Sequence, residues 1–204
     1  MKVGITINGV IRDFITKFEM VYDKYFPSEE ETEVEVVDRV IDSLNLMDHF
    51  KFNDIEDLNK FMYVDASLEI FGHAGETKLN SVEHLNKLHN LIEDMGHTPI
   101  LISKELNSSK PATLFFLSKL SCKVNQIIFV KDEEKKWDYV DILVTADPKT
   151  LDTKPSDKIS IKVINHYNKN CDSDYTIIDL KELIEDTQTL NKLFNTETVE
   201  FENL

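Results

Sequence analysis

The chain has 204 residues, of which 41% are hydrophobic, and it carries a formal net charge of −15 at pH 7. This hydrophobic share is enough for one sizeable core, so we expect one domain with an insertion and not two independent domains. Because nucleic-acid binding relies on lysine and arginine to neutralise phosphates, we expect no nucleic-acid partner for a chain this acidic.

The two cysteines, Cys122 and Cys171, lie far apart, and no signal peptide precedes the first apolar run. We therefore expect a reducing, cytoplasmic compartment and no disulfide framework. No stretch approaches the roughly 18 apolar residues that a membrane span needs, so we expect no membrane partner.

The first element is a short apolar strand that runs through a glycine turn into a helix, with the sequence Val3-Gly4-Ile5-Thr6-Ile7-Asn8-Gly9-Val10-Ile11-Arg12-Asp13-Phe14. Helical spacing of apolar residues over 13–25 predicts a helix with one buried face. Only helical periods follow, which predicts helices over 36–44 and 55–62 and a last one that ends at Phe71.

A capping-box pattern, Asn80-Ser81-Val82-Glu83, predicts the start of a helix that ends at Gly96. Two more helices are expected, one between Pro111 and Leu120 and one after Asp179. Five further apolar runs predict strands over 97–103, 126–130, 141–145, 159–163 and 175–178. Strands that alternate with helices in this way predict an α/β fold with a parallel sheet covered on both faces. Ligands of such sheets bind beyond the carboxyl ends of the strands.

Two polar residues, Thr6 and Asn8, lie at and just after the end of the first strand. A threonine hydroxyl is not nucleophilic until a base takes its proton, and no histidine lies within ten residues of Thr6. Asn8 can neither give nor accept a full proton, so it cannot act as a general acid or base. The six histidines contain no pair with zinc-ligand spacing, so we expect no zinc site.

The order and spacing of these residues resemble the haloacid dehalogenase-like (HAD-like) superfamily, and specifically its deoxyribonucleotidase-like branch. Its first motif, Asp-x-Asp-Gly-Val, is matched here by Thr6-Ile7-Asn8-Gly9-Val10. The resemblance implies a Rossmann-like core with a central parallel sheet and a helical cap insertion. It also implies that Thr6 occupies the position of the family's nucleophile and Asn8 the position of its general acid/base.

The other motifs of that family find weaker counterparts. The resemblance implies that Ser103 holds a phosphate oxygen and that Lys135 or Lys136 neutralises the phosphate. It also places Thr145 and Ala146 where paired acids bind Mg²⁺, with Asp147 displaced by one residue. Because Mg²⁺ tolerates little misplacement of its ligands, we expect the protein to bind neither a metal nor another cofactor. The alternative expectation is that it binds Mg²⁺.

Degenerate HAD-like proteins of tailed, crAss-like bacteriophages are also similar. They share a linker that resembles Phe71-Gly72-His73-Ala74-Gly75 and a helix that resembles Pro111–Lys119. The resemblance implies a non-catalytic fold that serves as a structural or protein-binding module.

The resemblance also sets the expected organisation and role of the chain. We expect a core over 1–26 and 76–186, a cap over 27–75 and an acidic C-terminal helix or tail over 187–204. The expected role is that of a virion component in the portal, neck or tail, with other phage proteins as partners and the host cytoplasm as its origin; oligomerisation is left open. The alternative is a residual Mg²⁺-dependent 5'(3')-deoxyribonucleotidase or phosphatase.

Overall fold

The computed structural model of the protein describes residues 1–27 and 39–194. Its centre is a six-stranded sheet in which every neighbouring pair of strands is parallel, in the order β3-β2-β1-β4-β5-β6. The predicted α/β fold with a Rossmann-like parallel sheet is therefore confirmed. The strands are β1 (Lys2–Thr6), β2 (Thr98–Lys104), β3 (Ile127–Val130), β4 (Ile142–Thr145), β5 (Ile159–Val163) and β6 (Tyr175–Ile177).

Strand β1 lies in the middle of the sheet, where the chain changes its direction of winding. Ile5 is in register with Leu101 of β2 on one side and with Val144 of β4 on the other. Successive residues of a strand point to opposite faces, so Leu101 packs into one core cluster and Ile102 into another. Because both faces of the central strands are buried, these strands are rich in apolar residues and were predictable from sequence.

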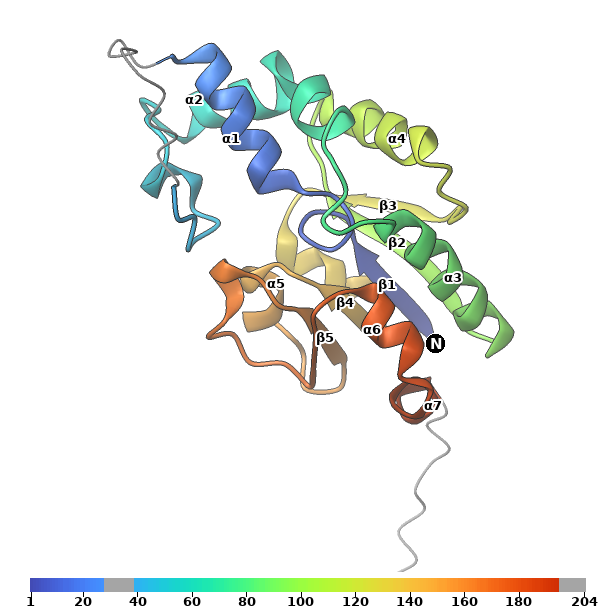
Figure 1. The fold of residues 1–204 in the computed structure, drawn as a ribbon. Coiled ribbons are helices and arrows are strands. Elements are labelled where there is room, and N and C mark those ends of the chain that lie inside the picture. The colour runs from blue at the N-terminus through green and yellow to red at the C-terminus, as the bar shows by residue number, and fades with distance from the viewer. Residues whose placement is uncertain (28–38, 195–204) are drawn as a thin grey trace, which may run out of the picture.

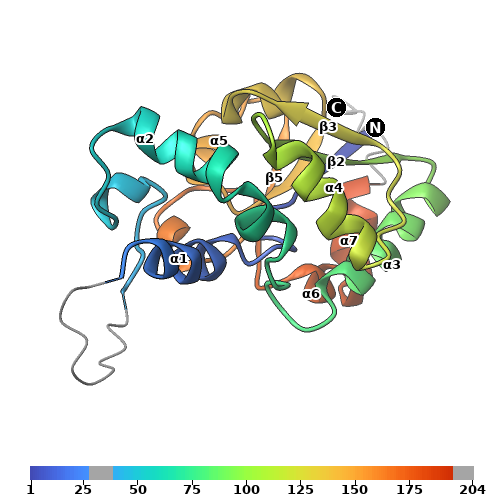
Figure 2. The same cartoon turned by 90° about the horizontal axis from the view of Figure 1, so that it is seen from above.

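Helices cover the two faces of the sheet unequally (Figures 1 and 2). Residues of α3 (Ser81–Asp94), α4 (Ser109–Lys119), α6 (Leu180–Glu185) and α7 (Thr187–Phe194) share the larger core cluster. The opposite cluster contains Trp137 from the 3₁₀ segment η4 (Glu133–Asp138), next to which lies α5 (Pro148–Asp152). A last 3₁₀ turn, η5 (His166–Asn168), follows β5.

The segment between α1 (Phe14–Tyr25) and α3 builds a second, aromatic core beyond the carboxyl end of β1 (Figure 1). Phe18 of α1 is fully buried there, with its ring centroid 4.8 Å from that of Phe50 and 5.9 Å from that of Phe61. The described elements of this insertion are the 3₁₀ turn η1 (Leu46–Asp48), α2 (Ile55–Lys60) and the two π-helical segments η2 (Phe61–Asp65) and η3 (Leu68–Gly72).

The predicted helix over 36–44 is wrong where it can be compared. Residues 36–38 lie outside the described ranges, and residues 39–44 form no helix. Ile41 is buried whereas Val40 is 74% exposed, so the apolar spacing there reflects a loop that turns one side chain inward. The Ser43 hydroxyl accepts a hydrogen bond from the Asn45 amide, and such local side-chain bonds compete with helix formation.

The predicted capping box at Asn80 is also wrong, although α3 does begin at Ser81. Asn80 has a left-handed backbone with φ of 63° and makes no capping bond with its side chain. Glu76 takes over, because its carboxylate accepts the Val82 amide at 2.7 Å.

The insertion returns to the core through a linker, residues 73–77, that is hydrogen-bonded to the loop after β1. The Asp13 amide donates to the Gly75 carbonyl at 2.9 Å, and the Thr77 amide donates to the Ile11 carbonyl at 3.0 Å. The Thr77 hydroxyl also donates to the Val10 carbonyl at 2.6 Å.

The C-terminal segment predicted over 187–204 contributes α7, and residues 195–204 lie outside the described ranges, as does the acidic run 28–35. The division into core, cap and tail stays a prediction. Within the described part of the chain, no helix combines the length and the apolar character that crossing a membrane requires.

Candidate functional site

A cleft of about 980 Å³ lies between the insertion and the carboxyl ends of β1, β2 and β4. This is the place where ligands bind in open parallel sheets, and the volume is at the upper end of the range for small-molecule sites. Five of the eight candidate residues line it: Thr6, Asn8, Ser103, Lys136 and Asp147. The other three do not: Lys135, Thr145 and Ala146.

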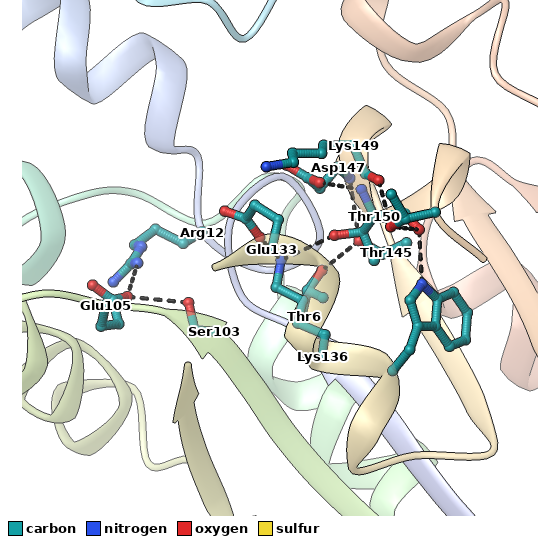
Figure 3. A network of polar contacts seen from close by, with 12 residues as sticks. Thr6, Arg12, Ser103, Glu105, Glu133, Lys136, Thr145, Asp147, Lys149 and Thr150 are labelled. Carbon is teal, nitrogen blue, oxygen red and sulfur yellow. Dashed lines mark hydrogen bonds and ion pairs between the residues drawn. The ribbon is translucent and has the colours of Figure 1, made fainter. Parts of the chain in front are cut away.

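Two threonine hydroxyls face each other at the ends of the neighbouring strands β1 and β4 (Figure 3). The Thr6 hydroxyl donates to the Thr145 hydroxyl at 3.3 Å, and both residues are buried. The Thr145 oxygen also accepts the Asp147 amide at 3.1 Å. The hydroxyl at the expected nucleophile position is thus engaged by a second neutral hydroxyl, which does not act as a general base.

Asn8 orients a buried arginine. Its side-chain oxygen accepts the Arg12 Nε–H at 2.7 Å, and Nη1 of Arg12 donates to the Phe71 carbonyl at 3.2 Å and to the Thr113 hydroxyl at 2.6 Å. Arg12 therefore connects the loop after β1 with the end of η3 and with α4.

Arg12 also forms an ion pair with Glu105 at 2.7 Å, and the side chains of both residues are 0% exposed. The same Glu105 oxygen accepts the Thr113 hydroxyl at 2.7 Å and the Ser103 hydroxyl at 3.1 Å (Figure 3). The Ser103 hydroxyl is therefore donated to a carboxylate of the protein itself, and the predicted phosphate-holding role has no free donor in this arrangement. Burial lowers the pKa of the Arg12 guanidinium, and the charge of Glu105 opposes that shift.

Of the two candidate lysines, Lys136 lines the cleft and Lys135 does not. Lys136 is buried, pairs with Glu133 one turn earlier in η4 and donates to the Thr150 hydroxyl at 3.4 Å. Burial raises the pKa of the Glu133 carboxyl, and the Lys136 charge opposes that shift. Lys135 is 62% exposed and lies 3.6 Å from Asp138.

Asp147 caps the short helix α5, where its carboxylate accepts the Thr150 amide at 2.6 Å. Ala146 is buried on the side of Gly9, whose backbone has φ of +74°. A Cβ at Gly9 would lie 2.8 Å from the Ala146 Cβ and still closer to the Tyr167 hydroxyl. The side chain at 146 therefore packs beneath the loop after β1 and not in the cleft.

Two tyrosines at the cleft keep their phenolic protons. Burial raises the pKa of Tyr63 and of Tyr167, and nearby carboxylates add to both shifts. For Tyr167 these are Asp147 and Asp13, whereas for Tyr63 Glu105 has the largest effect. Both hydroxyls are thus neutral groups beside negative charge.

The residues at the expected metal position do not fit Mg²⁺. This hard cation takes carboxylate oxygens at about 2.0–2.1 Å in octahedral geometry. Of Thr6, Thr145 and Asp147, only Asp147 is a carboxylate, and one of its oxygens caps α5. Among the residues that the structure describes, no group of three or more His, Cys, Asp and Glu side chains could hold a metal ion.

Sequence reasoning missed the buried ion pair of Arg12 and Glu105 and four further residues that line the cleft: Asp13, Lys104, Glu133 and Tyr167. A signal existed for Arg12, because an arginine directly after Val10-Ile11 interrupts an apolar run. Its partner Glu105 is separated from it by 93 residues, so no local pattern connects the two.

A scan against models of known protein families finds no match, and a search of curated proteins finds no significant relative. The function must therefore be inferred from the site itself.

Proposed function

We propose that the protein is a non-catalytic member of the HAD-like group that acts as a protein-binding module. The observation that carries this proposal is the mutual engagement of the polar groups beneath the cleft. Thr6 donates to Thr145, Asn8 accepts from Arg12, and Ser103 donates to Glu105. The Thr6 and Ser103 hydroxyl protons are thus directed at acceptors of the protein and not at a phosphate, and Thr6 is bonded to no base that could activate it.

The retained cleft supports a binding role. The aromatic core behind the insertion wall of the cleft is as fully buried as the core of the sheet, with Phe18, Ile70 and Phe71 all at 0% exposure. A fold that keeps both walls of its cleft while its reactive positions are neutral is suited to hold a partner without transforming it.

A phosphatase assay tests the lack of catalysis. We expect the purified protein to hydrolyse neither p-nitrophenyl phosphate nor nucleoside monophosphates, with or without Mg²⁺, above a buffer control. Lys136→Ala and Ser103→Ala are the informative variants, and exposed Lys135→Ala is the matched control. Mg²⁺-dependent turnover that Lys136→Ala abolishes and Lys135→Ala retains contradicts the proposal.

The same assay decides the alternative, a residual Mg²⁺-dependent 5'(3')-deoxyribonucleotidase or phosphatase. One observation favours it: Ser103 and Lys136, the counterparts of the phosphate-holding residues, line a single cleft together with Asp147, which is displaced by one residue from the expected acids. Against it stand the neutral Thr6 and the pairing of Lys136 with Glu133.

We further propose that the protein belongs to a phage particle, as the resemblance to crAss-like phage proteins implies. A component of a stable assembly is held by an obligate interface above about 2,000 Å². Proteomics of purified particles from the source tests this role. We expect the chain at stoichiometric levels, whereas its recovery in the soluble fraction alone refutes the virion role.

A further inference from the structure

The cleft has an apolar wall that the proposed binding role has not yet used. On the side of the insertion, Val40 is 74% exposed and Ile55 is 56% exposed, and both line the cleft. Met62, Leu44 and Ile15 line the same cleft. Exposed apolar side chains that gather in a concave site favour a ligand with apolar groups of its own.

The charge of the cleft disfavours an anion. Its described lining contains six carboxylates but only four lysine or arginine side chains. Two of these cations are already neutralised, because Lys136 pairs with Glu133 and Arg39 lies 2.8 Å from Asp23 and 3.5 Å from Glu19.

Two carboxylates of the cleft take part in no ion pair among the described residues. Asp13 and Asp147 each accept one backbone amide, from Thr16 at 3.3 Å and from Thr150 at 2.6 Å, and neither forms an ion pair with a described residue. Both act on the same phenol, Tyr167, which stays neutral because its pKa is raised. A carboxylate has two oxygens, so each aspartate keeps acceptor capacity for a further donor.

We propose that the cleft binds a polypeptide segment with both basic and apolar side chains, one guanidinium or ammonium group of which lies between Asp13 and Asp147. The apolar side chains of the segment pack against Val40 and Ile55. This inference rests on the proposed binding function and names the class of its partner. Charge-assisted hydrogen bonds from arginine to a carboxylate are the stronger kind of hydrogen bond and give the site its selectivity.

The chain offers a matched pair of variants for the test. Asp13 and Asp147 cap α1 and α5, and asparagine caps helices as well as aspartate, so the double variant Asp13→Asn/Asp147→Asn removes two charges and keeps both caps. Asp179 and Asp186 accept the Glu182 and Thr189 amides at 3.0 Å in the same manner but lie outside the cleft. Asp179→Asn/Asp186→Asn therefore changes the net charge equally and is the control.

The measurement is fluorescence anisotropy with a short labelled peptide of alternating arginine and leucine, and a glutamate–leucine peptide as the comparison. We expect the first peptide to bind and the second not. The Asp13→Asn/Asp147→Asn variant should weaken binding about tenfold, whereas the Asp179→Asn/Asp186→Asn variant should stay within about twofold of the parent.

A second pair of variants tests the apolar wall without touching a cap. Val40→Lys replaces an apolar side chain of the wall by a positive charge, which repels the basic peptide and should weaken its binding. Leu79→Lys adds the same charge at a residue that is 85% exposed and outside the cleft, so it should not weaken binding. The inference is overturned if each cleft variant and its control lose the same peptide affinity. It is also overturned if both peptides bind alike, or if inorganic phosphate displaces the bound peptide. The phosphatase assay is independent of these outcomes, so failure here leaves the non-catalytic proposal to be judged by its own result.

Discussion

The buried pair of Arg12 and Glu105 makes a quantitative prediction. Glu105→Gln keeps the shape of the side chain but leaves the Arg12 cation in a site where both residues are 0% exposed. Removing one member of a buried ion pair costs about 3–5 kcal/mol, because the other charge is left uncompensated. A chain of this size loses about 2–4 °C of melting temperature per kcal/mol, so we expect a decrease of at least about 6 °C.

A double-mutant cycle separates this pair from ordinary loss of packing. Arg12→Met/Glu105→Gln leaves neither charge buried, so its loss of stability should be smaller than the sum of the single losses by about 2 kcal/mol. Unfolding in urea can be followed by the fluorescence of Trp137, which is the only tryptophan and is 3% exposed. Glu83→Gln, in a pair exposed by 58% and 56%, is the control and should leave the midpoint unchanged. Additive losses, or a loss below about 1 kcal/mol for Glu105→Gln, would refute the coupled buried pair.

Two further predictions concern the loop after β1 and the buried phenols. Gly9→Ala should destabilise the protein by about 1–3 kcal/mol and by more than Gly96→Ala. Both glycines have positive φ, but only at Gly9 would a Cβ meet the Tyr167 hydroxyl. Equal losses of stability for the two variants in thermal unfolding would count against this crowding. Burial raises the pKa of Tyr63 and Tyr167 in the folded state, so the stabilisation is present below the ordinary pKa of about 10 and is lost as pH rises above it. The Tyr63→Phe/Tyr167→Phe variant should therefore lose stability less steeply than the parent between about pH 9 and 11, and exposed Tyr139→Phe should match the parent.

The sheet could be predicted from the sequence because its strands are buried on both faces. The predicted strand 159–163 agrees with β5, the prediction 97–103 is shifted by one residue from β2, and those for β3, β4 and β6 are one residue too long at one end. The site could be predicted in part, because the carboxyl ends of parallel strands converge and bring Thr6, Ser103 and Asp147 to one cleft.

The interactions of the site could not be predicted, because they depend on the folded geometry both for residues far apart, such as Thr6 and Thr145, and for near neighbours. Ser103 ends an apolar strand as expected, yet its hydroxyl is engaged by Glu105, two residues further on and buried only in the folded chain. The choice between Lys135 and Lys136 depended on how η4 is rotated against the sheet, which a lysine pair does not specify. At 39–44, a helical period of apolar residues coincided with a loop, because periodicity alone carries no information on local hydrogen bonds.

The bonds at the end of the insertion have a consequence for how the cleft receives a partner. The Gly75 carbonyl and the Phe71 carbonyl are both held by the loop after β1, the second of them by a buried arginine. A wall that is fastened in this way cannot swing aside without breaking the hydrogen bond of a buried guanidinium, so we expect the cleft to keep its shape in the absence of a partner. A preorganised site loses little conformational entropy on binding, and its contacts translate into affinity more fully than those of a lid that must first close.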